Sequence, residues 1–200
     1  MRTPRILIAG IGNIFLGDDA FGVEVVRRLA GHRLPEGVKV VDFGIRSFDL
    51  AYALCDGYDA IILVDAVPRG EPPGTLYVIE PEIPAPAGGE AEELPAVATH
   101  NMNPATVLRL AAAMGGQVGR VFVVGCEPTP LKSEGDMEME LSPAVSEAAD
   151  GAVELIESLV AGIRRCELLA AGEPTSEGHR AMSGLSPDVS DPIDDCSGMA

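Results

Sequence analysis

The sequence has few basic residues and no long apolar run, and both absences exclude classes of function. Its 200 residues contain 14 Lys and Arg against 31 Asp and Glu, which gives a formal net charge of −17. Binding to nucleic acid depends on a basic surface that releases counterions from phosphate, so this charge argues against a nucleic acid partner. No stretch is apolar enough to cross a bilayer, and the N-terminal segment lacks the cleavage site of a signal peptide. We therefore expect a cytoplasmic protein without a membrane partner.

Two sequence motifs that would point directly to a function are also missing. The four cysteines are widely scattered and form no C-x-x-C pair (Cys55, Cys126, Cys166 and Cys196). In a reducing compartment such cysteines are expected to be buried or spectator thiols. No Gly-Lys-Ser/Thr follows any glycine of the sequence, which excludes a P-loop.

The dinucleotide fingerprint G-x-G-x-x-G fails as well, although the failure is less complete. After Gly10 and Gly12, the third glycine position is occupied by Phe15. Asp42, at the end of the second apolar run, still resembles the acid that binds ribose in dinucleotide folds. A nucleotide-binding α/β module that uses Gly10, Gly12 and Asp42 therefore stays open as an alternative.

The sequence does contain a regular alternation of apolar runs and helical periodicity. Strands are predicted at 6–9, 38–41, 60–64, 75–79 and 121–124, and helices at 20–30, 48–54, 103 to about 115, and 142 to about 170. This order predicts an α/β fold with three layers, in which a largely parallel twisted sheet of about five strands has helices on both faces. Val23, Val26 and Leu29 are expected to form the apolar face of the first helix.

The composition changes near the end of the chain. From about residue 172 onward it is rich in Gly, Pro, Ser and Asp and shows little periodicity. Such a segment buries too little apolar surface to offset its ordering entropy. We expect one domain over residues 1–171 and a disordered tail over residues 172–200.

The segment GIGNIFLGDDAFG, residues 10–22, leads from the first predicted strand into two adjacent aspartates. Asp18 is explained as the N-cap of the helix that follows, where a carboxylate is favourable. Capping does not need Asp19, and neighbouring carboxylates repel each other unless a cation lies beside them. Asp19 is therefore a candidate metal ligand.

Asp65 and His100 are the other candidate ligands. Asp65 closes the third predicted strand in LVDAV, and His100 lies in ATHNMNP just before a predicted helix. A turn or capping role for Asp65 and a solvated loop position for His100 are the alternatives. Asp19, Asp65 and His100 can all reach the carboxyl edge of one sheet, where open α/β sheets bind ligands. Two carboxylates and one imidazole suit zinc or nickel and leave coordination positions open.

Taken together, four segments make the chain resemble the hydrogenase maturation endopeptidases, which process the large-subunit precursor of nickel-iron hydrogenases. The segments are GIGNIFLGDDAFGVEVV, LVDAV, His100 with Asn101, and VVGCEP followed by LSPAV, and they match in order from about Ile6 to Leu159. The resemblance implies that Asp19, Asp65 and His100 bind a metal and act in catalysis through it, with no separate base. Many relatives have Asp-Gly-Gly-Thr where this chain has DFGI at 42–45, so Asp42 is a candidate substrate contact or a turn residue.

The resemblance also implies a substrate and a cofactor. The expected activity is an endopeptidase that removes the C-terminal extension of the nickel-loaded large-subunit precursor. Nickel would be supplied by the precursor, and zinc or another divalent cation could substitute for it. Either a metal-bound water attacks the peptide, or the three residues hold the substrate's nickel and so position the scissile bond. Cys126 is expected to pack rather than act as a nucleophile, and the protein is expected to be a monomer.

Overall fold

The computed structural model describes residues 2–81, 104–116, 118–130 and 139–170. The predicted tail, residues 172–200, and the candidate ligand His100 lie outside these described residues. The boundary expected near residue 171 therefore stays a prediction. Among the described residues, no helix is both long and apolar enough to cross a membrane.

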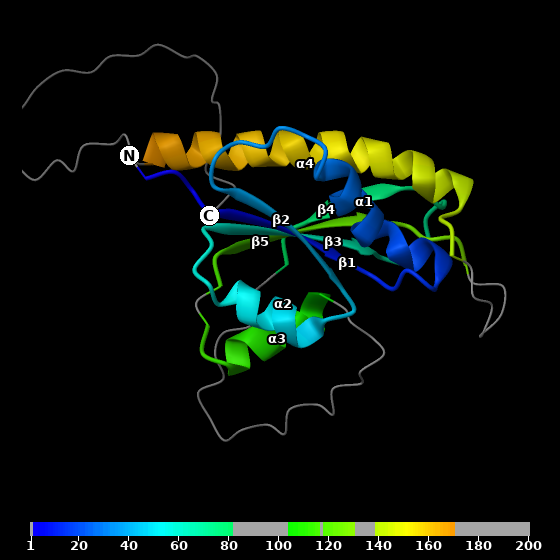
Figure 1. Cartoon of the computed structure of the whole chain (residues 1–200), viewed down its shortest axis with the longest axis horizontal. Coiled ribbons are helices and arrows are strands. Elements are labelled where there is room, and N and C mark those ends of the chain that lie inside the picture. The colour runs from blue at the N-terminus through cyan, green and yellow to red at the C-terminus, as the bar shows by residue number, and fades with distance from the viewer. Residues whose placement is uncertain (1, 82–103, 117, 131–138, 171–200) are drawn as a thin grey trace, which may run out of the picture.

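A five-stranded sheet forms the centre of the molecule, with the strand order β2-β1-β3-β5-β4 (Figure 1). The strands are β1 (Ile6–Ile11), β2 (Val38–Gly44), β3 (Ala60–Ala66), β4 (Leu76–Ile79) and β5 (Arg120–Cys126). Strands β2, β1, β3 and β5 are mutually parallel, whereas β4 pairs with β5 in the antiparallel direction. The predicted fold class is confirmed, and all five predicted strands are present.

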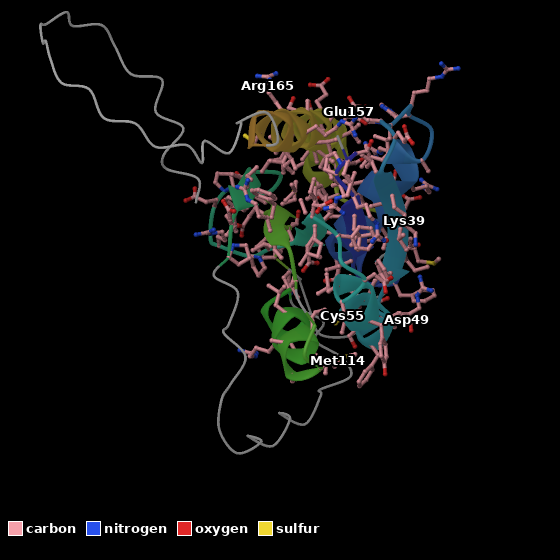
Figure 2. All side chains as sticks on the ribbon, turned by 90° about the vertical axis from the view of Figure 1, so that its left-hand side faces the viewer. Lys39, Asp49, Cys55, Met114, Glu157 and Arg165 are labelled. Carbon is pink, nitrogen blue, oxygen red and sulfur yellow. The ribbon has the colours of Figure 1, made fainter. Side chains whose placement is uncertain are left out.

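Helices cover both faces of the sheet. They are α1 (Phe21–Leu29), α2 (Ser47–Leu54), α3 (Pro104–Ala113) and α4 (Pro143–Ala170). Figure 1 shows α1 and α4 on one face and α2 and α3 on the other. The same layers are seen from the side in Figure 2, where Glu157 and Arg165 mark α4, Asp49 marks α2, and Cys55 and Met114 directly follow α2 and α3.

The two faces of the sheet follow directly from the alternation of side chains along each strand. Ile62 and Val64 of β3 belong to the core that α1 and α4 cover, while Ile61 and Leu63 belong to the core that α2 and α3 cover. Because β3 is buried on both faces, its sequence is apolar at nearly every position, as expected for a central parallel strand. The only charged residue of β3 is Asp65, close to its carboxyl end.

The start of the first helix differs from the prediction. A 3-10 turn, η1 (Gly17–Ala20), precedes α1, so the helix begins at Phe21 rather than at residue 20. The buried face of α1 includes Phe21, Val25, Val26 and Leu29, whereas Val23 is only half-buried. Val23 therefore does not share the fully buried face with Val26 and Leu29, and it lines a surface groove instead.

Glycines allow α1 to lie unusually close to the strands. A Cβ atom on Gly22 would lie 2.0 Å from the Val64 carbonyl oxygen and 2.4 Å from that of Ile11. A Cβ atom on Gly10 would lie 2.4 Å from the Gly22 carbonyl oxygen. Backbone atoms cannot move aside as a flexible side chain can, so Gly22 is required for this approach of α1 to β1 and β3.

Replacing Gly22 with Ala is therefore expected to lower the free energy of unfolding by about 1 to 3 kcal/mol, because the added methyl forces α1 away from the sheet. The matched control is Gly162→Ala in α4, where nothing lies within 4 Å of the added Cβ. That change is expected to be neutral or to stabilise by up to about 1 kcal/mol, as alanine is the better helix former. Urea unfolding of both variants measures the difference, and equal stabilities would contradict the packing argument.

Candidate functional site

In a sheet with this topology, the crevice for a ligand is expected at the carboxyl ends of β1 and β3. The chain leaves β1 toward β2 on one side, and it leaves β3 toward β4 and β5 on the other. Adjacent parallel strands whose connections run in opposite directions form the position where open α/β sheets bind ligands. Gly10 pairs with Val64 at this end of the two strands, so η1 and the last residues of β3 meet there.

Asp19 is brought to this crevice by the loop that follows β1. The Asn13 amide donates a hydrogen bond of 2.7 Å to Asp19 Oδ2, which fixes the carboxylate against the loop. Gly12 has a φ of +137°, and a Cβ there would lie 1.8 Å from the Asp19 carbonyl oxygen. The glycine is thus required for the loop to fold back on itself. Asp19 is half-buried and keeps part of its surface accessible to a ligand.

Asp65 lies at the end of β3 and is only 5% exposed. Burial raises its pKa to about 8, with a further increase from the charge on Asp19 and a partial offset from the backbone N–H of Ala66. The effect of Asp19 on this pKa shows that the two carboxyls, 46 residues apart in sequence, are electrostatic neighbours. A buried acid beside a second acid is neutral unless a cation compensates its charge. The structure therefore brings Asp19 and Asp65 together, as the sequence predicted.

The third predicted ligand, His100, lies outside the described residues, and its position stays a prediction. The described part of the chain contains no group of three or more His, Cys, Asp or Glu side chains suited to a metal. Helix α3 begins at Pro104, four residues after His100, and leads to the start of β5 at the amino edge of the sheet. The start of α3 therefore lies toward the carboxyl edge, on the face to which Asp65 belongs (Figure 1).

Asp42 is not brought together with Asp65. Asp42 pairs with Gly10 and lies on the same face of β2 as Val38 and Val40, which pack in the core beneath α1 and α4. Asp65 lies on the opposite face, in line with Leu63. A groove of about 600 Å³ is lined by Asp42 together with residues of the β1 loop, α1 and the segment before α4 (Ile14, Ala20, Val23, Met139 and Leu141 among them). Asp42 thus lines this neighbouring groove and lies on the opposite face of the sheet from Asp65.

Asp18 does not cap a helix, and that prediction was wrong. Neither η1 nor α1 has a side-chain cap hydrogen bond. Instead the Asp18 carboxylate is buried and accepts bonds from the Thr129 amide (2.8 Å), the Ser142 amide (2.6 Å) and the Ser142 hydroxyl (2.9 Å). Burial by itself would raise the pKa of Asp18, but these hydrogen bonds outweigh it and lower the pKa. Asp18 therefore ties the loop of Asp19 to the segment after β5 and to the start of α4.

A second buried carboxylate, Glu127, was missed by the sequence analysis. It accepts hydrogen bonds from the amides of Arg69 (2.7 Å) and Gly70 (3.0 Å) and from the Tyr77 hydroxyl (2.6 Å). The bond from Tyr77, followed by those from the backbone amides, lowers the pKa of Glu127 despite its burial. The available signal was an acid directly after a buried strand, in the segment GCEP. Cys126 itself is buried, which raises the pKa of its thiol to about 12 and agrees with a packing role.

Large apolar side chains are exposed around the loop of Asp19. Ile14, Phe15 and Leu16 lie between Gly12 and Gly17, and Ile45 and Phe48 follow β2. Strands β1 and β2 are neighbours in the sheet, so these residues belong to the same carboxyl edge. Exposed apolar side chains gathered at one edge are typical of a surface that binds another protein.

Comparison with known proteins gives consistent matches. The family model described as hydrogenase maturation protease matches residues 23–159. The hydrogenase expression/formation protein HupD of Rhodobacter capsulatus is 34% identical over 154 residues, covering 76% of this chain and 69% of that protein. HoxM of Azotobacter vinelandii is 31% identical over 197 residues, covering 88% of this chain and 91% of that protein.

Solved structures also match. The hydrogenase maturating endopeptidase HybD from E. coli is 28% identical with a TM-score of 0.61, covering 79% of this chain and 93% of that one. The [NiFe] hydrogenase maturation protease HycI from Thermococcus kodakarensis is 28% identical with a TM-score of 0.53, covering 78% of this chain and 92% of that one.

The raised pKa of Asp65 predicts an unusual pH dependence of stability. Unfolded Asp65 ionises near its usual value of 3.8, whereas folded Asp65 ionises at about 8. Its contribution is complete below the unfolded pKa and is lost as the pH rises through the folded pKa. Asp65→Asn cannot ionise, so the metal-free variant is expected to exceed the wild type in stability at about pH 8 by on the order of a few kcal/mol. Urea unfolding at about pH 5 and about pH 8 tests this prediction. An equal difference in free energy of unfolding between variant and wild type at the two pH values would contradict it.

The bonds to Asp18 predict that Asp18→Asn lowers the free energy of unfolding by about 1 to 3 kcal/mol, because the amide group turns an N–H toward a backbone donor. The stabilising effect of Asp18 is present above its unfolded pKa and is lost as the pH falls through its lowered folded pKa. The difference between the variant and the wild type should therefore shrink in acid. Asp56→Asn, an exposed site between α2 and β3, is the control that should not change stability.

Proposed function

Because this chain belongs to the hydrogenase maturation protease family, we propose that it removes the C-terminal extension from the nickel-loaded large-subunit precursor of a nickel-iron hydrogenase. Membership of this family makes the protein a hydrolase that acts on a peptide bond during hydrogenase maturation. The similarity to HybD, a hydrogenase maturating endopeptidase, and to HycI, a [NiFe] hydrogenase maturation protease, supports the proposed reaction and its target.

The observation that carries the proposal is the pair of carboxyls at the crevice. Asp65 is buried beside Asp19 in a position where its ionised form is unfavourable without a nearby cation. Carboxylate oxygens together with an imidazole nitrogen are a suitable donor set for nickel or zinc. We propose that Asp19, Asp65 and His100 bind the nickel of the precursor, and that zinc or another divalent cation can substitute. In this proposal the nickel is part of the substrate.

Recognition of nickel would also orient the peptide that is cut. A divalent cation can polarise a carbonyl group or lower the pKa of a bound water. The residues of this chain supply the positioning: Asp19 is held by the Asn13 amide, and Asp65 is held at the end of a buried strand. Fixing one part of the precursor at this point restricts the scissile peptide to a small region, and such restriction can account for a large part of a rate enhancement. No separate general base is assigned.

The exposed apolar residues next to Asp19 support a protein as the substrate. Phe15 and Leu16 precede Asp19 by only a few residues, and Ile45 follows the neighbouring strand. Burying such side chains against a partner contributes roughly 25 cal/mol for each Å² of apolar surface. A short peptide that carried only the cleavage sequence would lack most of this contact, so an intact precursor is the appropriate test substrate.

The test is processing of nickel-loaded and nickel-free precursor, read by the mass of the product. Asp19→Asn, Asp65→Asn and His100→Ala are each expected to abolish cleavage of the nickel-loaded form, because each removes a donor to the same ion. A double variant should be little worse than a single one, since the three residues act as a unit. The wild type should leave the nickel-free precursor uncut.

Asp56→Asn is the matched control for loss of one carboxylate, because Asp56 is exposed and lies just before β3, at the amino edge of the sheet. Its processing rate should equal that of the wild type. Equal cleavage of the nickel-loaded and nickel-free precursors would refute nickel recognition. Full activity in Asp19→Asn or Asp65→Asn would remove that residue from the site.

A further inference from the structure

The loop that follows Asp65 is held in a defined shape by Glu127. The backbone amides of Arg69 and Gly70, four and five residues after Asp65, donate to the two oxygens of the Glu127 carboxylate. Glu127 is only 5% exposed, so these charge-assisted bonds are shielded from water. The backbone at Arg69 is therefore not free to move as an ordinary surface loop would.

Tyr77 lies in the same row of the sheet as Asp65. Asp65 pairs with Gly125, and Gly125 pairs with Tyr77, so the three residues cross β3, β5 and β4 on one face. Gly125 has no side chain, and Val67 packs over it: a Cβ on Gly125 would lie 2.9 Å from Val67 Cγ2 and 3.4 Å from the Tyr77 ring. With neighbouring strands about 4.8 Å apart, the backbones at Asp65 and Tyr77 are roughly 10 Å apart. An extended peptide of about three residues covers this distance.

The side chain of Arg69 is held over the Tyr77 ring. Its guanidinium carbon lies 5.3 Å from the ring centroid, within the range of a cation–π contact. The tyrosine hydroxyl donates to Glu127, so ring and loop are both anchored to the same buried carboxylate. Arg69 is exposed, and within the described residues it forms no salt bridge. In a chain with a net charge of −17, Arg69 is thus a cation without a carboxylate partner among the described residues, four residues after Asp65.

We propose that Arg69 determines specificity by binding an acidic side chain of the substrate. From the strand spacing given above, this acid lies roughly three to five residues from the substrate segment held over Asp65. This inference rests on the proposed function, since it assigns a contact to the same site. Glu127 and Tyr77 are positioning residues that present the guanidinium without touching the substrate. A planar guanidinium held in advance is well suited to a carboxylate, because little side-chain freedom is lost on binding.

The experiment measures steady-state processing of the intact nickel-loaded precursor by full-length enzyme. Arg69→Gln is expected to raise KM about three- to tenfold with kcat unchanged, because the contact is formed in the ground state and the transition state alike. Arg165→Gln is the matched control: it removes one exposed arginine near the C-terminal end of α4, which lies at the opposite edge of the sheet from the start of α1 (Figure 1), and it should leave KM unchanged. The effect of Arg69 should also weaken as salt increases.

The positioning residues have their own variants. Tyr77→Phe keeps the ring beneath Arg69 and removes only the bond to Glu127, whereas Tyr77→Leu removes the cation–π contact as well. Tyr77→Leu should raise KM more than Tyr77→Phe, and adding Arg69→Gln to Tyr77→Leu should raise KM no further. Glu127→Gln keeps an acceptor oxygen for the loop and should be closer to the wild type than Glu127→Ala. A simple loss of folding would instead lower the active fraction and so lower the apparent kcat in all four variants.

The partner residue is found by neutralising, one at a time, the acidic residues of the precursor within about five positions of the cut. One of these changes should raise KM in the wild type and have no effect in Arg69→Gln. Exchanging the charges, with lysine in the precursor and Arg69→Glu in the enzyme, should restore KM.

Three outcomes separate the two proposals. A KM for Arg69→Gln equal to that of Arg165→Gln, with active wild type, overturns the assignment of Arg69 alone. The absence of any coupled acid in the precursor does the same. A wild type that leaves the nickel-loaded precursor uncut overturns the proposed function and with it this inference.

Discussion

The close contact of Gly22 with the backbones of β1 and β3 is the constraint on which the candidate site depends. It allows the first turn of α1 to lie on the ends of two strands, and the loop before it must then fold sharply through Gly12. That fold places Asp19 next to the last residues of β3, where Asp65 lies. A glycine-rich loop in this position serves the packing of the chain against itself. The nucleotide-binding alternative is not needed to explain Gly10 and Gly12, because a Cβ atom on either residue would meet protein atoms.

Placing two carboxyls together in this way opposes stability. Burial and the neighbouring charge both disfavour ionised Asp65, and its raised pKa expresses that cost. A protein selected for stability alone would have an apolar residue or an amide in place of Asp65. All other positions of β3 are apolar. The fold therefore does not account for an acid at this position, which agrees with the ligand role proposed for Asp65. The apolar residues beside it follow the same logic, because each of them leaves 40–60% of its surface exposed in the described chain.

Most of the fold could be predicted from the sequence, because the strands and helices depend on local periodicity. The two misses at the site, Asp18 and Glu127, share one physical cause, which is contact between residues far apart in the sequence. Asp18 has the residue type and position of a helix cap, but its donors, Thr129 and Ser142, lie more than a hundred residues away. Glu127 likewise meets an amide 58 residues earlier. Asp19 and Asp65 were predictable as a pair because the ends of parallel strands must share one edge, whereas hydrogen bonds between loops follow no such rule.

The segment after β5 explains how two repelling acids are kept together. Glu127 holds the loop that follows Asp65, and two residues later the Thr129 amide binds Asp18, the neighbour of Asp19. Pro128 lies between them and restricts the backbone that joins the two contacts. The loops that carry Asp19 and Asp65 are thus attached to the same short segment, each through a buried carboxylate whose hydrogen bonds favour its ionised form. These bonds hold the loops of Asp19 and Asp65 in place against the repulsion between the two acids. The distance between Asp19 and Asp65 is therefore set by residues that need not touch the substrate.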